Sequence, residues 1–115
     1  MIYTINHRFT SLNKYINAER RNRHIAAKIK KDETNIAYVS LIGKQPIDTP
    51  CKLKFTWYIK DKRTDADNIC FAKKYILDGM MKAELIENDS LQYITGFTDE
   101  FVIDKNERVE IEVYE

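Results

Sequence analysis

The 115-residue chain is long enough for one compact domain and leaves no room for a second catalytic domain. Its two cysteines have neither CxxC nor CxxH spacing, so the sequence predicts reduced thiols in a cytoplasmic protein instead of a zinc site or a disulfide scaffold. Because it has neither a signal-like segment nor a run of about 20 apolar residues, we expect neither secretion nor membrane insertion.

The net charge is only +1, but the charges are sorted along the chain. Between residues 14 and 31, a single acid, Glu19, stands among these basic residues: Lys14, Arg20, Arg21, Arg23, Lys28, Lys30 and Lys31. After residue 83 the balance reverses, with ten acids against Lys105 and Arg108. Such asymmetry indicates a surface for a polyanion in the basic part of the molecule.

The first half of the chain predicts a short strand followed by helix. Residues 2–8 are rich in β-branched and aromatic side chains and favour a strand. From 16 to 42 the pattern is helical, because Ile25, Ile29 and Ile36 fall within about 40° of one another at 100° per residue. Gly43 is a plausible stop. The sequence predicts one long helix here, or two joined near Asp32.

The second half predicts three strands and another helix. Residues 43–50 contain both prolines and read as a loop, and residues 52–60 then alternate, with these apolar positions on one face: Leu53, Phe55, Trp57 and Ile59. A helix is predicted over 68–81, with this apolar ridge: Ile69, Ala72, Ile76 and Met80. Strands are expected at 93–101 and 108–114. This order predicts an α+β fold, a small mixed β-sheet with two main helices packed on one face.

The segment Asp65-Ala66-Asp67-Asn68 lies between the clearest strand and the second predicted helix. Two carboxylates in a DxD arrangement can hold a divalent metal ion. An ordinary explanation stays open, since Asp and Asn also cap exposed N–H groups at a helix start and interact favourably with its dipole.

Two further groups extend this candidate site. Counted from Asp67 at 100° per residue, Lys74 and Asp78 lie within about 20° of the same stripe, opposite the apolar ridge. They could equally form a simple i, i+4 ion pair. Asn88-Asp89-Ser90 follows the helix, and its loop is expected to return a third carboxylate to the first two, although the same residues suit a polar turn.

Three aspartates and a lysine supply what phosphodiester hydrolysis requires. Carboxylates hold a hard cation that activates water, and an ammonium offsets charge on the phosphate. An EF-hand is excluded because Cys70 stands where its loop requires Gly and Ile76 where it requires Glu. A sugar-nucleotide transferase requires a larger nucleotide-binding domain. His7 and His24 belong to no nucleophile motif and are expected to be surface residues.

The stretch DADNICFAKKYILDGMMKAELIENDS, from Asp65 to Ser90, resembles the RusA-type Holliday junction resolvases of bacteria and their phages. That family shows DxDN, a lysine three residues before Leu-Asp-Gly, and a loop ending in Asp-Asp-Ser. Ser11-Leu12-Asn13-Lys14-Tyr15 is similar to the family's S-x-N-x-Y segment, without the proline that often precedes it. The resemblance covers most of the chain, and Asn88 departs from it where many members carry Asp.

The resemblance implies a homodimeric, magnesium-dependent endonuclease that resolves four-way DNA junctions in recombination and repair, with manganese as a substitute metal. It implies a metal site of Asp65, Asp67 and Asp89 and a catalytic Lys74. Helix phase also favours Lys74 over Lys73. Asn68, Asp78 and Asn88 are assigned supporting roles. DNA phosphates would be held by the following residues: Lys14, Arg20, Arg21, Arg23, Lys28, Lys30, Lys31, Lys62 and Arg63.

Two other functions stay open. Because Asn88 replaces an acid, the chain could bind branched DNA with little or no catalysis. A metal-stabilised structural protein is a third interpretation, against which the basic stretch argues, because such a protein has no need of a polyanion-binding surface.

Overall fold

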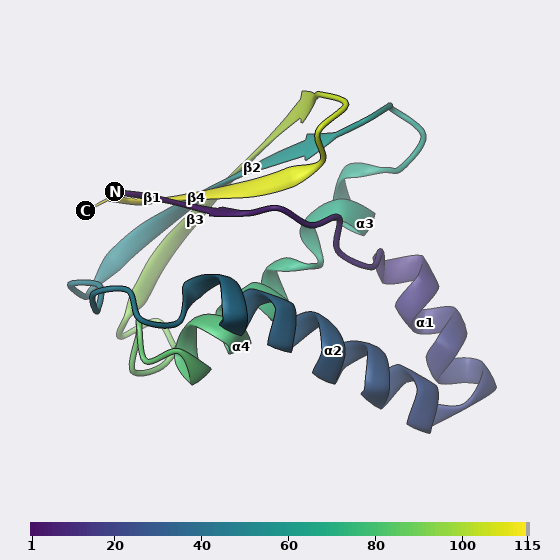
Figure 1. Cartoon of the computed structure of the whole chain (residues 1–115), viewed down its shortest axis with the longest axis horizontal. Helices are drawn as coiled ribbons and strands as arrows, with labels where there is room; N and C mark the ends of the chain where they lie inside the picture. Colours follow the sequence, from purple (N-terminus) through teal and green to yellow (C-terminus); the bar gives the residue numbers. More distant parts are fainter. Residues whose placement is uncertain (115) are drawn as a thin grey trace.

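A computed structural model describes residues 1–114 and contains one four-stranded sheet (Figure 1). The strands, in chain order, are β1 (Ile2–Ile5), β2 (Cys51–Ile59), β3 (Ile94–Ile103) and β4 (Arg108–Tyr114). Their order across the sheet is β1-β4-β2-β3, with β2 and β3 parallel and the other neighbours antiparallel. The mixed sheet and the expected strands are confirmed, within a few residues at their ends.

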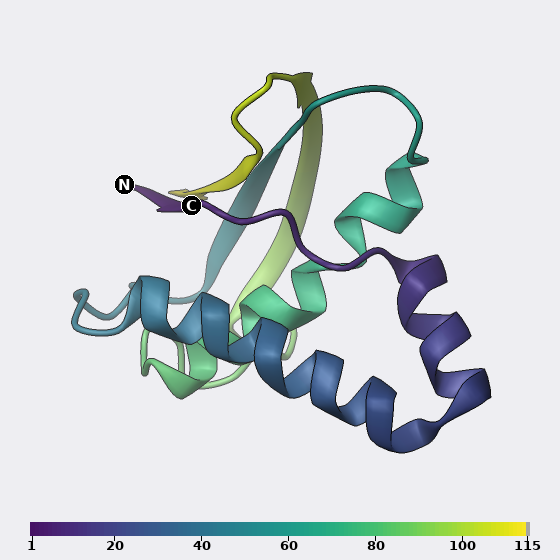
Figure 2. The ribbon, with the colours of Figure 1, turned by 45° about the vertical axis from the view of Figure 1, so that its right-hand side comes forward.

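The helices lie on one face of this sheet (Figure 2). The alternation along β2 places Leu53, Phe55 and Trp57 in the core, each at most 2% exposed, while Lys52 on the opposite face is exposed. Strands of this kind bury alternate side chains because successive residues point to opposite faces. The predicted α+β architecture is therefore confirmed. In residues 1–114, no helix is long and apolar enough to span a membrane.

The first helical region differs from its prediction. It begins four residues earlier and divides at Asn22, not near Asp32, into α1 (Leu12–Arg21) and α2 (Arg23–Leu41). Ser11 caps α1 by accepting a hydrogen bond from the backbone N–H of Lys14. Asn22 has an extended backbone, and its side chain accepts from the N–H of His24 to cap α2. Capping by Asn22 thus favours a break where hydrophobic periodicity indicates none.

The buried face of α2 also differs from the face predicted from Ile25, Ile29 and Ile36. Ala26, Ala37 and Leu41 are buried, whereas Ile25 is 47% exposed. The N-terminal half of α2 extends past the sheet (Figure 1), so it lacks the sheet as a packing partner. Ile25 instead lines a cavity between α1 and α2.

The second helical region comprises α3 (Ala66–Cys70) and α4 (Lys73–Lys82) instead of one helix over 68–81. Between them the hydrogen bonds change to the i, i+3 type, from Ala72 N to Ile69 O and from Lys74 N to Phe71 O. This tighter turn separates the axes of the two helices. The predicted apolar ridge is nevertheless buried on both.

Close packing of α4 against α2 depends on Gly79. A Cβ atom at Gly79 would lie 2.6 Å from the Cβ of Ala37 and 3.0 Å from the backbone nitrogen of Tyr38. Gly79→Ala is therefore expected to destabilise the fold by about 1–3 kcal/mol, although alanine has the higher helix propensity. Chemical denaturation measures this effect. Gly96→Ala is the control, because its nearest neighbour is the flexible Lys52 side chain at 3.4 Å; equal losses would contradict the packing argument.

The segment between β1 and α1 is anchored to α2 by a buried carboxylate. Glu33 is 9% exposed; one oxygen lies 2.8 Å from His7 Nε2, and the other accepts from the Thr10 hydroxyl at 2.9 Å. His7 is thus half-buried and structural, not the expected surface residue, whereas His24 is exposed. A buried carboxylate requires such partners because of its desolvation cost, and they fix the approach of the chain to α1.

Tyr75 has the only buried side-chain polar atom in residues 1–114 without a hydrogen-bond partner. Burial, and then the Glu33 carboxylate, raise the pKa of its phenol above 10.0. The fold therefore loses stability as the pH rises above 10.0. Tyr75→Phe is expected to leave stability at pH 7 unchanged or raise it by about 1 kcal/mol, and to reduce alkaline unfolding. Thermal melts at pH 7 and 11 test this, with Tyr58→Phe, which loses a bond to Glu110, as the control.

Candidate metal and nucleic-acid site

The first two aspartates stand at the start of α3, where β2 has left the sheet. Asp65 is the N-cap residue by position, but its side chain makes no capping hydrogen bond and is exposed. Asp67 is exposed too, and its Oδ1 accepts only from the neighbouring N–H of Asn68 at 3.0 Å. The capping explanation therefore does not hold for Asp65. Both carboxylates retain oxygens that can face a cation.

Asn68 joins the two segments that carry the family resemblance. Its side chain is buried, and Oδ1 accepts from the backbone N–H of Asn13 at 2.8 Å. Asn13 belongs to the first turn of α1, so this bond ties the start of α1 to the start of α3. A buried amide with a paired acceptor fixes the relative position of its two helices. Asn68 thus positions the carboxylate segment beside the basic N-terminal region.

The two neighbouring lysines of α4 have different environments. Lys74 is 52% exposed and pairs with Asp78, with 3.1 Å between Nζ and Oδ1. Lys73 is 16% exposed and lies 2.6 Å from Asp99 Oδ2 on β3. Asp99 also accepts from the indole N–H of Trp57, so Lys73 is part of a structural network. Of the two, Lys74 has the more accessible ammonium group.

Because α3 and α4 have separate axes, the stripe counted from Asp67 does not continue strictly to Lys74. Lys74 and Asp78 still share one face of α4, as their hydrogen bond shows. The simple i, i+4 ion pair that the sequence left open for Lys74 and Asp78 is therefore present. The bond is equally suited to orienting the Lys74 ammonium.

Asp89 lies at the other end of the sheet from Asp65 and Asp67. β2 and β3 are parallel, so the chain leaves the C-terminal end of β2 toward Asp65 and returns along α4 to the N-terminal end of β3. Hydrogen bonds from Cys51 N to Tyr93 O and from Ile47 N to Leu85 O hold the Asp89 loop at that second end. Nine strand residues span about 27 Å.

The expectation that this loop returns Asp89 to the first two carboxylates is therefore wrong within one chain, because a parallel crossover separates its two connecting loops. No three His, Cys, Asp or Glu side chains in residues 1–114 lie close enough together to hold a metal ion. Asn88 has a local role: its Oδ1 accepts from the N–H of Ser90 at 3.1 Å and closes the turn around Asp89.

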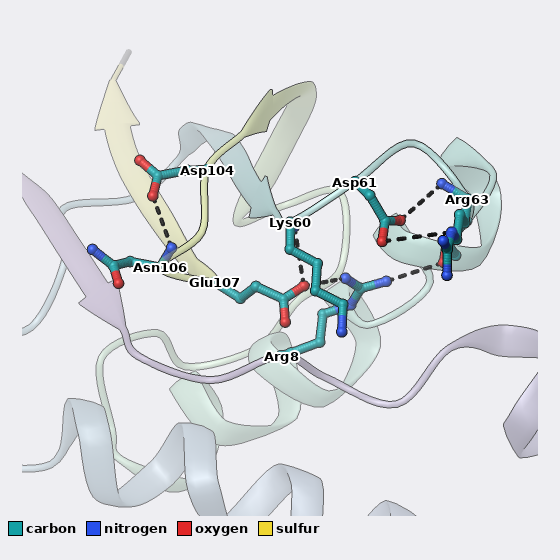
Figure 3. Close-up of polar contacts among 8 residues, drawn as sticks. Arg8, Lys60, Asp61, Arg63, Asp104, Asn106 and Glu107 are labelled. Atoms are coloured by element: carbon teal, nitrogen blue, oxygen red, sulfur yellow. Dashed lines mark hydrogen bonds and ion pairs between the residues drawn. The ribbon is translucent and has the colours of Figure 1, made fainter.

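A basic cavity borders the Asp65 segment, and sequence patterns did not indicate it. Its volume is about 400 Å³, and its basic lining residues come from three segments of the chain: Arg8, Lys14, Lys60 and Arg63. Two acids, Asp61 and Glu107, also line it and pair with Arg63 and Arg8. Arg8 crosses it, donating to Glu107 on one side and to the hydroxyl of Thr64 on the other (Figure 3). Because Thr64 precedes Asp65, Arg8 holds the loop before α3 to the β3–β4 turn.

The role of Arg8 could not have been inferred from the sequence, because only the fold brings residue 8 to residues 64 and 107. Lys60 offered a weak signal, since it follows directly on the alternating strand and precedes Lys62 and Arg63. In residues 1–114, the ammonium groups of Lys14 and Lys60 have no acidic partner within ion-pair distance. An anion could displace water from both without breaking an existing pair.

The predicted DNA-binding side chains are all exposed, and α1 and α2 display most of them: Lys14, Arg20, Arg21, Arg23, Lys28, Lys30 and Lys31. They lie on two helices that meet at Asn22, not on one straight helix (Figure 1). A second cavity of about 390 Å³ separates these helices and is lined by Lys14 and Arg21. Lys14 lines both cavities, so the two adjoin at this residue.

Cys70, at the end of α3, is the remaining reactive side chain near these carboxylates. Burial, and then the Asp99 carboxylate, raise the pKa of its thiol above 9.0. The thiol therefore stays protonated at neutral pH.

Neither a comparison with protein-family models nor a comparison with curated proteins finds a match for this chain.

Proposed function

We propose that the chain is a magnesium-dependent endonuclease of the RusA type that nicks four-way DNA junctions during recombination and repair. The observation that carries the proposal is the position of two exposed, uncapped carboxylates, Asp65 and Asp67, beside a basic cavity. The Asn68–Asn13 bond adds support, because it joins the two sequence segments that resemble the family.

The donor set at the start of α3 fits magnesium. This ion is commonly held by one or two carboxylates, with water and substrate phosphate oxygens completing its coordination. Asp65 and Asp67 would provide those carboxylates. When bound, the metal supplies a water nucleophile at neutral pH and offsets charge on the scissile phosphate.

The basic side chains have the complementary task of holding DNA. Lys60 and Lys14, which have no acidic partner within residues 1–114, would bind backbone phosphates in the cavity beside Asp65. The basic residues of α1 and α2 would extend this contact along an arm of the junction. Phosphate contacts of this kind orient DNA without reading its sequence. Lys74, on the exposed side of α4, would place a positive charge near the reacting phosphate.

A homodimer, the second part of the proposal, also gives Asp89 a place in the site. One chain keeps Asp89 and Asp65 at opposite ends of the β2–β3 pair. A second copy related by twofold symmetry can bring its Asp89 loop to the Asp65 end of the first, and the reverse contact follows from the same symmetry. Two such sites would serve two opposing strands of a junction.

A synthetic four-way junction tests the function directly. With magnesium, the wild-type protein is expected to leave ligatable nicks near the crossover, and EDTA is expected to abolish nicking while junction binding persists. A linear duplex with the sequence of one arm is the control for structure selectivity. Absence of cleavage with magnesium and with manganese would refute the enzyme proposal.

One observation favours a second candidate, a branched-DNA-binding protein with little or no catalysis. Residues 1–114 of a single chain do not assemble three carboxylates, and Asn88 uses its oxygen to close a turn. Junction binding in EDTA, with no nicking under any divalent metal, would support this alternative over the endonuclease.

A further inference from the structure

The long edge strand β3 exposes apolar side chains that nothing in residues 1–114 covers. The exposed fractions are 47% for Phe97, 38% for Phe101, 38% for Val102 and 49% for Ile103. β3 has ten residues and pairs on one side only, with β2, whereas the opposite edge strand β1 has four. A long apolar edge without proline or lysine readily pairs with another strand.

Three of these four apolar side chains point toward the helix layer. The β2–β3 register places Phe97 beside Leu53, Phe101 beside Trp57 and Ile103 beside Ile59. These β2 neighbours are buried, yet the β3 residues are not, because the helices extend only partly over the edge strand. Phe97 contacts the Phe55 ring at 6.0 Å between centroids and the Lys73 ammonium at 4.5 Å.

The acids in the middle of β3 are neutralised inside the chain. Asp99 is bound by Lys73 and by the Trp57 indole N–H, and Glu100 lies 3.3 Å from Lys54 on the other face. Two copies of an acidic strand centre would otherwise repel each other across a twofold axis. Local pairing removes that obstacle to self-association.

We infer that two copies of the chain pair through β3, antiparallel, to form one continuous sheet. Antiparallel pairing makes the interface self-complementary about a twofold axis. It also sets the N-terminal end of the partner's β3 beside the C-terminal end of the first, where β2 leads to Asp65 and Asp67. The Asp89 loop directly precedes β3, so this arrangement brings it to the required end.

This inference rests on the homodimer of the proposed function and names its surface. Pairing through the opposite edge of the sheet would not bring the partner's Asp89 loop to Asp65, because β1 is short and lies two strands away from β2. The side of α4 that carries Lys73 faces β3.

Sedimentation tests the interface. The wild-type chain is expected to have twice the mass of one copy, and Phe101→Lys is expected to give a folded monomer. Val39→Lys, on α2, is the matched control, because Val39 is a 62% exposed apolar residue outside β3; it should remain dimeric. A wild-type monomer at all concentrations, or a Phe101→Lys dimer, would overturn the inference.

Amide hydrogen exchange of the wild-type protein keeps the inference testable if Phe101→Lys does not fold. Exchange across residues 94–103 is expected to slow as protein concentration rises into the dimer range. Concentration-independent exchange, or protection only after junction DNA is added to a monomer, would overturn the pairing. A monomer that nicks junctions would refute this interface and the homodimer but not the endonuclease, and a β3 dimer that never nicks would refute the endonuclease but not this interface.

Discussion

Asp67→Asn is expected to reduce junction nicking by a factor on the order of 100 to 1000, because it removes a carboxylate that would hold the metal and orient the reacting groups. The fold should be unaffected. Asp67 is exposed, and an asparagine Oδ1 can still accept the hydrogen bond from the N–H of Asn68. Single-turnover nicking with saturating protein, at several magnesium concentrations, separates this loss from weaker binding.

Asp48→Asn is the matched control, since Asp48 is an exposed aspartate in the loop before β2 with no part in the proposed site. It should nick at the wild-type rate. Junction binding in EDTA should be unchanged or tighter for Asp67→Asn, because a negative charge near the DNA is lost. Undiminished nicking by Asp67→Asn would refute the metal assignment.

Mixed dimers extend this prediction to Asp89. If each site takes Asp67 from one copy and Asp89 from the other, a dimer of one Asp67→Asn chain and one Asp89→Asn chain has one intact site. It should nick one strand of the junction, while both parent homodimers are inactive. Inactive mixed dimers would show that Asp89 does not act from the partner.

The sheet could be predicted from the sequence because burial imposes a simple period on it. Alternation along residues 52–60 located β2 and its core face, and the ridge from Ile69 to Met80 located the buried face of the second helical region. Such periods depend on one side of an element facing the core. They indicate which face is buried, whatever the neighbouring elements are.

Helix boundaries depended on local features, a polar cap and a tighter backbone turn, that hydrophobic periodicity does not register. Asn22 is extended and caps α2, and a tighter turn at Phe71 and Ala72 divides α3 from α4. The role of Gly79 also could not be predicted, because it follows from contact with Ala37, a residue 42 positions earlier in the chain (79 − 37). The sequence cannot reveal which helix will approach so closely.

Parts of the candidate site follow from local geometry. Asp65 and Asp67 lie close together because only Ala66 separates them, and the Lys74–Asp78 bond follows from helix geometry. The position of Asp89 depended on whether β2 and β3 are parallel, which their sequences do not specify. Arg8 reaches the site only through the fold.

Lys74→Met and Lys73→Met are expected to have opposite effects on nicking and on stability, although the two residues are adjacent. Lys74→Met should reduce nicking on the order of 100-fold or more, because it removes the charge proposed to face the scissile phosphate. Stability should scarcely change, since an exposed i, i+4 pair contributes a few tenths of a kcal/mol, roughly. Methionine preserves the aliphatic stem in both variants, so the comparison isolates the ammonium group.

Lys73→Met should instead destabilise the protein by about 1–3 kcal/mol, because it leaves the largely buried Asp99 carboxylate without its cation. Thermal melts measure that loss, and nicking is compared at a temperature where every variant is folded. Under that condition Lys73→Met should retain more activity than Lys74→Met. Asp78→Asn should lose less than Lys74→Met, because it removes an orienting partner and not the charge itself. Equal nicking by the Lys73 and Lys74 variants would contradict the assignment of Lys74.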